Sequence, residues 1–238
     1  MFQTFFYQPM LNLLVFLYDI IPGHDLGVVI IVLAILIRLA LYPLTKSMLK
    51  SQKALQELQP KIKEIQKKYP KKEDQSKAML ELYKNNKVNP FSSCLPLIIQ
   101  MPFLIAIFQV LRNGFGNGTL DLVYSFVSRP DSINHISFGV FDLSAPHNVA
   151  LAILAGLAQF WQSKMMLAKR PEIKADESRD EDMTAIMNKQ MTYMFPLLTI
   201  WFSYSFPSGL ALYWLMTTLA TVAQQKMIFK KSPEEEVV

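Results

Sequence analysis

The sequence predicts an all-α polytopic membrane protein with five transmembrane helices. One reason is that the apolar residues of the 238-residue chain are gathered into five long blocks: 27–44, 94–111, 149–167, 191–206 and 208–223. A helix crosses the hydrocarbon core with about 17–25 mostly apolar residues. The other reason is that the basic residues are concentrated in alternate connections between the blocks, as a cytoplasmic face requires.

The positions of the 24 basic residues predict the orientation. Twelve lysines lie in 46–90, five basic residues lie in 168–189, and three lysines follow the last block. The opposite connections hold only Arg112 and Arg129. Because Lys and Arg accumulate on the cytoplasmic side, we expect the N-terminus outside and the C-terminus in the cytosol.

The N-terminal residues 2–21 are apolar but interrupted by polar residues and Pro9. They form either a sixth span or an amphipathic helix lying in the outer membrane surface. We favour the surface helix, because no flanking basic residue would orient a span. We expect no signal peptide, because a basic n-region and a cleavage motif are both missing, and the lone Cys94 excludes an internal disulfide.

Residues 46–90 are predicted to form a cytosolic antiparallel helical hairpin. Five residues repeat at steps of 3 and 4, the seam of a coiled coil: Leu55, Leu58, Ile62, Ile65 and Tyr69. Pro60 should kink this arm, and Pro70 should end it. The hairpin is either a solvated spacer or a surface that contacts a partner.

These expectations give the following organisation. The chain would consist of an outer interfacial helix (1–26), a first span (27–45), the cytosolic coiled-coil hairpin (46–90), a second span (91–112), an outer loop (113–147), a third span (148–167), a cytosolic loop (168–189), a fourth span (190–206), a fifth span (207–227) and a cytosolic tail (228–238).

Arg38 is the one charged residue in its apolar block. It lies six residues before Leu44, about 9 Å along a helix, and each other span has polar groups near this depth. The polar residues are Arg38, Gln100, Gln159, Gln162, Thr199, Thr217 and Thr218. They could line a hydrophilic cavity open to the cytosol, since membrane-embedded charge usually faces a bundle interior. Alternatively, Arg38 extends to the headgroups and the others join neighbouring helices.

We expect no enzyme activity, cofactor, metal or small-molecule substrate. Cys94 lies at the inner end of its span, whereas all three histidines fall on the outer side, which excludes a Cys–His pair. The spans contain no carboxylate pair, and the chain has no phosphate loop or metal-binding motif.

A stripe of methionines leads from the cytosolic loop into the fourth span, and it includes Met187, Met191 and Met194. Methionine adapts to varied apolar partners, so the stripe could be a slide for hydrophobic segments. Ordinary packing would produce the same spacing.

Three stretches in this order resemble the YidC/Oxa/Alb family of membrane protein insertases: "IRLALYPLT" (37–45), "NPFSSCLPLIIQMP" (89–102) and "FPSGLALYW" (206–214). The likeness covers about residues 5 to 231 and is to the short five-span bacterial forms. Ser92 and Ser93 replace a Gly pair often found there, and the tail after Lys231 is shorter and less basic than in many members.

The resemblance implies a bacterial plasma membrane protein that inserts newly made membrane proteins without ATP. It also implies action alone or beside the Sec translocon, often with a ribosome docked. We expect the chain to be a monomer. The groove arginine of the family falls on Arg38, its groove glutamine on Gln159 or Gln162, and its aromatic residue in the last span on Trp214.

Two other functions remain open from the residues alone. An anion channel or transporter could use Arg38 as its binding site, although the odd number of spans and the lack of two similar halves argue against it. A membrane scaffold could use the hairpin to recruit a cytosolic partner.

Overall fold

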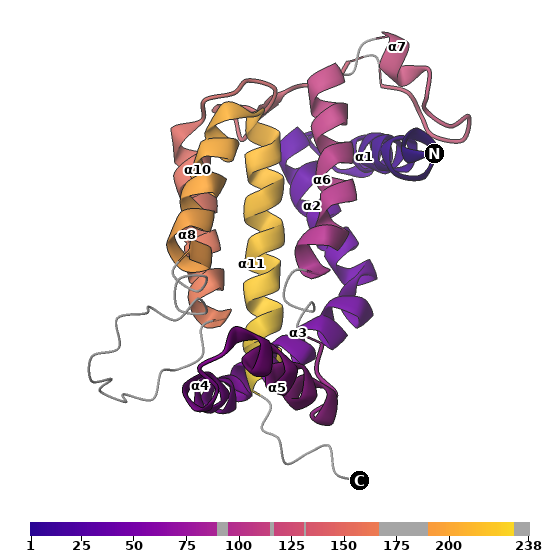
Figure 1. Cartoon of the computed structure of the whole chain (residues 1–238). Coiled ribbons are helices and arrows are strands. Elements are labelled where there is room, and N and C mark those ends of the chain that lie inside the picture. The colour runs from indigo at the N-terminus through magenta and orange to yellow at the C-terminus, as the bar shows by residue number, and fades with distance from the viewer. Residues whose placement is uncertain (90–94, 115–116, 131, 167–189, 231–238) are drawn as a thin grey trace.

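The computed structural model describes residues 1–89, 95–114, 117–130, 132–166 and 190–230. The described chain is mostly helical, as the sequence predicts. Helix α11 (Ser208–Lys230) stands at the centre of the molecule, as Figure 1 shows. Helices α8 (Val149–Met166) and α10 (Phe195–Ser205) lie on one side of it, and α2 (Leu26–Ala40) and α6 (Leu95–Asn113) on the other. All four contact α11, which therefore joins the two halves of the bundle.

The N-terminal segment forms a short π-helix, η1 (Gln3–Tyr7), followed by α1 (Gln8–Ile20). Helix α1 packs against α2 and α6 and lies across them rather than along them (Figure 1). Its inner face, which includes Leu11, Leu14 and Val15, is fully buried, whereas Phe16 on another face is exposed. The segment is thus amphipathic, and its place in a membrane surface remains a prediction.

The first apolar helix is shorter than the sequence predicts. It ends at Ala40, five residues before the expected boundary, and α3 (Tyr42–Glu57) begins after a break at Leu41. Pro43 falls in the first turn of α3, where the missing N–H of proline costs no hydrogen bond. The two helix axes differ by 69°. Arg38 consequently lies in the last turn of α2.

Among the described residues, no single helix is both long and apolar enough to cross a membrane, and only the bent pair α2 and α3 meets the requirement together.

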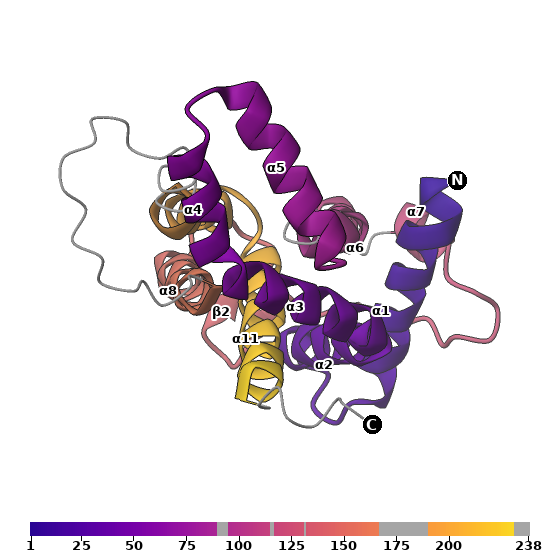
Figure 2. The ribbon, with the colours of Figure 1, turned by 60° about the horizontal axis from the view of Figure 1, so that its bottom comes forward.

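The lysine-rich segment contains α3, α4 (Gln59–Lys68) and α5 (Lys72–Asn85). The first arm is interrupted at Leu58, and Pro60 lies in the first turn of α4. Leu55, Leu58 and Ile62 of the predicted seam are buried. Helices α4 and α5 contact each other at one end of the bundle, as Figure 2 shows from below. This end is called the α4–α5 end.

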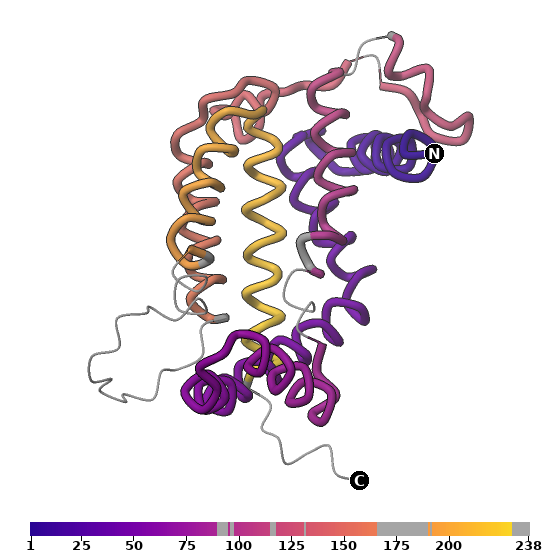
Figure 3. Tube along the Cα trace, viewed as in Figure 1, coloured from indigo at the N-terminus to yellow at the C-terminus, as the bar shows by residue number. Residues whose placement is uncertain are grey.

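The connection from α6 to α8 covers the opposite end of the bundle, as the Cα trace in Figure 3 shows. We call residues 117–130 and 132–147 the cap segment. It contains the short helix α7 (Asn117–Leu120) and two strands, β1 (Ile136–Ser137) and β2 (Phe141–Asp142), which pair antiparallel. The sequence analysis did not predict these strands.

Helix α1 holds the cap segment through Asn12. This side chain is buried, donates to the carbonyls of Gln8 and Leu122, and accepts from the backbone N–H of Tyr124 at 2.7 Å. The hydroxyl of Tyr18 accepts from the N–H of Asn134 at 2.9 Å. Because buried polar groups need partners, Asn12 stabilises the cap rather than merely interrupting an apolar run.

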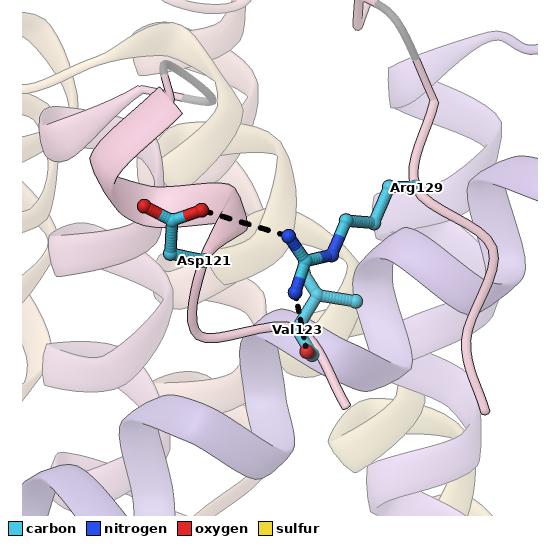
Figure 4. Close-up of polar contacts among 3 residues, drawn as sticks. All are labelled: Asp121, Val123 and Arg129. Atoms are coloured by element: carbon cyan, nitrogen blue, oxygen red, sulfur yellow. Dashed lines mark hydrogen bonds and ion pairs between the residues drawn. The ribbon is translucent and has the colours of Figure 1, made fainter. Parts of the chain in front are cut away.

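Arg129 makes two contacts within the cap segment. Its guanidinium lies 3.5 Å from the carboxylate of Asp121 and donates to the carbonyl of Val123 at 3.4 Å, as Figure 4 shows. The ion pair is well exposed, so it contributes little to stability. The positive charge of Arg129 is nevertheless paired with Asp121.

The first residues of α11 also join the cap segment. The backbone N–H of Ser208 donates to Ala145 O and that of Gly209 to Leu143 O, both at 2.9 Å. A Cβ at Gly209 would lie 2.9 Å from Leu111 and 3.1 Å from Ile30, so glycine permits a close approach of three helices here.

Asp25 joins the cap segment to the start of α2. Its carboxylate caps α2 by accepting from the N–H of Gly27 and Val28, and it also accepts from the hydroxyl of Ser137 and the N–H of Phe138. Burial opposes ionisation of this carboxyl, but the hydrogen bonds outweigh it and hold its pKa below the ordinary 3.8.

The cap should therefore loosen in acid. A carboxyl whose pKa is lowered by folding contributes stability above its unfolded pKa and loses it as pH falls through the folded pKa. We expect the melting temperature in detergent to fall as the pH drops below 3.8, the ordinary pKa of Asp25. The Asp25→Asn variant should show a flatter profile. A steeper fall in the variant than in the wild type would contradict this assignment.

Candidate functional site

Arg38 lies in the last turn of α2, where its positive charge is favourable to the carbonyl end of the helix. Most of its side chain is covered by protein, and its buried Nε atom has no hydrogen-bond partner in the part of the chain that the structure describes. None of the described Asp or Glu side chains forms an ion pair with it. A buried donor without a partner is costly, so the site favours an acceptor beside Arg38.

Tyr213 on α11 connects Arg38 to a second predicted residue. Its side chain is 0% exposed and lies close enough to Arg38 for an electrostatic interaction. Its hydroxyl accepts a hydrogen bond from Nε2 of Gln100 on α6 at 2.8 Å. Three helices thus meet at Tyr213. We did not predict its role, although a phenol in an apolar span, next to Trp214, should need a polar partner.

Gln159 and Trp214 meet on a different side of α11. Nε1 of Trp214 donates to Oε1 of Gln159 on α8 at 3.4 Å, and Gln159 is buried. Successive helical residues point about 100° apart, and Tyr213 accordingly contacts α6 whereas Trp214 contacts α8. Gln162 is partly exposed, and it forms no hydrogen bond with these residues in the described structure.

The predicted threonines are buried, and two of them bond to their own helices. Thr199 donates to the carbonyl of Phe195, and Thr217 donates to those of Tyr213 and Trp214. Thr218 is also buried. These bonds satisfy the hydroxyls locally, so the threonines add polarity without joining the Arg38 group.

Of the predicted methionine slide, Met187 and the side chain of Met191 lie outside the described residues. Met194 is half exposed. Close to it, α8 and α10 form an apolar cavity of about 240 Å³, whose lining includes Phe160 and Tyr193. This cavity is separate from Arg38 and its neighbours.

Two further buried glutamines lie on α11 nearer the α4–α5 end, and the sequence analysis passed over them. Gln225 is 0% exposed, and neither its amide oxygen nor its nitrogen has a hydrogen-bond partner among the described residues. Oε1 of the buried Gln224 is in the same situation. Five polar residues between positions 217 and 225 could have indicated a hydrated part of the helix: Thr217, Thr218, Thr221, Gln224 and Gln225.

The hydroxyl of Tyr213 should matter for stability as well as for the site. Replacing Tyr213 with Phe leaves the amide of Gln100 without its acceptor, which costs about 1–3 kcal/mol for a buried donor. We expect a lower midpoint of thermal unfolding in detergent. The matched control is Tyr204→Phe, because that hydroxyl makes no hydrogen bond in the described structure. Equal midpoints for the two variants would contradict the contact.

The sequence that forms this arrangement matches a known protein family. The family model of the 60Kd inner membrane protein matches residues 16–235. A relative from Fusobacterium nucleatum, called membrane protein insertase YidC, is 33% identical over 232 residues, which are 96% of this chain and 99% of that protein. This chain belongs to the YidC family.

Other YidC proteins differ in length. YidC 1 of Lactococcus lactis is 36% identical over 87% of this chain and 69% of its own length. YidC of Chlamydia muridarum is 36% identical over 89% of this chain, but only 27% of that protein is covered. The chain thus spans about a quarter of the length of this Chlamydia relative.

A solved YidC structure has the same fold. The crystal structure described as an active YidC insertase with the first transmembrane domain resolved is 26% identical, with a TM-score of 0.60. The likeness covers 97% of this chain and 47% of that one. The helical arrangement around α11 is therefore that of a YidC protein.

Proposed function

We propose that the chain is a membrane protein insertase that admits newly made polypeptides to the bilayer through a hydrophilic groove at Arg38, without ATP. The observation that carries the proposal is an arginine in an apolar helix whose buried Nε has no hydrogen-bond partner among the described residues, in a chain matching a YidC of its own length. In this proposal α2, α6, α8, η3 (Gln190–Met194) with α10, and α11 are the five spans.

Exposed apolar side chains support the membrane placement. Large apolar residues stand exposed on the outward faces of several helices, including Leu39, Ile98, Leu157, Leu197 and Trp201. Large exposed apolar areas are rare on soluble monomers and often mark a membrane or protein contact. Lipid would cover it, with the cap segment on the outer side and the α4–α5 end in the cytosol, so the N-terminus is outside and the C-terminus inside.

The distribution of unpartnered polar atoms supports a groove that is wet from the cytosolic side. Three side chains have buried atoms without hydrogen-bond partners in the described structure: Nε of Arg38, Oε1 of Gln224, and both Oε1 and Nε2 of Gln225. Buried polar groups of this kind are usually satisfied by water. Ser203 Oγ, close to the cap end, does not follow this distribution. The hydrogen bonds of Asn12 and Asp25 hold the cap closed.

Such a groove lowers the cost of moving a polar tail across the membrane. A charged group at the bilayer centre costs about 2.5–3.5 kcal/mol on insertion scales, and a water-filled path from one side shortens the dry distance. Arg38 attracts acidic residues of the incoming tail. Burial of the substrate's hydrophobic segment in lipid, at about 25 cal/mol per Å², then drives insertion. We place Gln100, Gln159, Tyr213 and Trp214 along this groove.

The partners follow from the same mechanism. The substrates are nascent membrane proteins, and the lysine-rich α3–α5 segment is a basic surface suited to the RNA of a translating ribosome. The chain acts as a monomer, either alone or beside the Sec translocon, in the bacterial plasma membrane.

Reconstitution tests the proposal directly. The purified chain in liposomes, without ATP, should insert an in vitro translated single-span substrate with a short acidic outer tail, measured by protease protection. Protein-free liposomes are the control. Ion flux without insertion would instead indicate an anion channel, and activity lost completely on deleting 53–85 would favour a scaffold.

A further inference from the structure

We propose that the pocket between η1 and the cap end of α6 binds the phosphodiester headgroup of a membrane phospholipid. The proposal requires only that Arg112 lie at a membrane surface. It goes beyond the proposed function, because it does not require that the chain insert other proteins.

The pocket has the size and the lining of a binding site. Its volume is about 490 Å³, within the range of ligand sites in proteins. It is lined by Phe2, Gln3, Tyr7, Gln109, Arg112 and Asn113. The lining thus offers one guanidinium and three amides as hydrogen-bond donors and contains no acidic side chain, a combination that selects an anion.

Arg112 is free to bind such an anion. It lies in the last turn of α6, and its guanidinium carbon is 5.8 Å from the centre of the Phe108 ring. It forms no ion pair with a described acidic residue, unlike Arg129, whose charge is engaged by Asp121. A guanidinium matches two phosphate oxygens at once, which makes arginine well suited to phosphate.

Two elements hold the pocket in shape. Nδ2 of Asn113 donates to the hydroxyl of Tyr7 at 3.3 Å, and Tyr7 itself is buried. This contact ties η1 to the last turn of α6. The donors from α6 are therefore on a packed helix, to which η1 is joined at Tyr7.

An aromatic strip beside the pocket favours a lipid over a free phosphate ion. The ring of Phe2 stacks on Phe6 at 5.5 Å, and Phe6 meets Phe103 edge-on at 5.8 Å. Phe103 precedes Arg112 by nine residues, about 14 Å along the helix towards the membrane interior. A headgroup at Arg112 would thus continue into acyl chains that lie against these rings.

Native mass spectrometry of the full chain in detergent tests this site. The probe is dioleoylphosphatidylglycerol, and the comparison ligands are dioleoylglycerol, which lacks the phosphate, and inorganic phosphate. We expect Arg112→Gln to lower the affinity for phosphatidylglycerol by about 10-fold, the worth of one charge-assisted hydrogen bond. The matched control Arg129→Gln should bind like the wild type. Dioleoylglycerol should bind weakly, and phosphate should not compete.

Three results would overturn the proposal. They are unchanged phosphatidylglycerol affinity in Arg112→Gln, equal retention of dioleoylglycerol, and displacement of the lipid by an equal concentration of inorganic phosphate. If Arg112→Gln does not fold, Gln109→Leu removes a lining amide instead, and wild-type affinity in that variant overturns the site. No insertion assay enters the experiment, so its outcome is separate from that of the proposed function.

Discussion

Replacing Arg38 with alanine is expected to reduce insertion of an acidic-tailed substrate by about 10-fold or more. The estimate is the loss of one charge-assisted hydrogen bond of about 1.5–3 kcal/mol between the guanidinium and a substrate carboxylate. The structure gives Arg38 no carboxylate of its own among the described residues. The charge is therefore available to the substrate. The measurement is protease protection of the inserted substrate in liposomes.

Two comparisons make this result specific to charge. Arg38→Lys keeps the charge and should retain most of the activity, and a substrate with a neutral tail should be much less affected by Arg38→Ala. The variants should be matched for folding by their thermal midpoints, because the stem of Arg38 also packs against neighbours. Wild-type insertion of the acidic-tailed substrate by Arg38→Ala would remove Arg38 from the mechanism.

Replacing Asp25 with alanine is expected to lower stability by about 1–3 kcal/mol, from a lost helix cap and lost hydrogen bonds to an ionised acceptor. The carboxylate accepts from the backbone N–H of Gly27 at 2.8 Å and of Phe138 at 2.7 Å, so it links α2 to the cap segment. The variant should unfold at a lower temperature, and amide exchange should increase at the strands β1 and β2 above all.

Asp19 supplies the matched control. It is exposed at the end of α1, and Asp19→Ala should leave both the midpoint and the exchange unchanged. Asp25→Asn retains a carbonyl acceptor and should lose only part of the stability. Uniform exchange across the bundle in Asp25→Ala, without enrichment at residues 136–142, would show that Asp25 does not hold the cap.

The sequence predicted helix breaks and buried positions well where a short segment determines its own structure. The break before α5 follows from Pro70, and the burial of Leu55, Leu58 and Ile62 follows from their spacing. The end of α2 was placed too late. Pro43 is compatible with a continuous kinked helix and with the first turn of a new helix. Hydropathy alone cannot distinguish these two structures.

Contacts between distant segments were not accessible from one sequence. Asn12 looked like a polar interruption, whereas its partners are 110 and 112 residues away, at Leu122 and Tyr124. The bond between Gln100 and Tyr213 spans 113 residues. Strands of two residues show no alternation of polar and apolar positions that could predict them. The site was thus predicted as separate polar residues, without the tyrosine that joins two of them.

The bend between α2 and α3 lies close to Arg38. Arg38 lies three residues before the break at Leu41, and beyond this break α3 extends for 16 residues, about 24 Å. A partner that binds the lysine-rich helix α3 and moves it would therefore also displace the last turn of α2, which carries Arg38. In the orientation proposed above, a partner that binds α3 would therefore act close to Arg38.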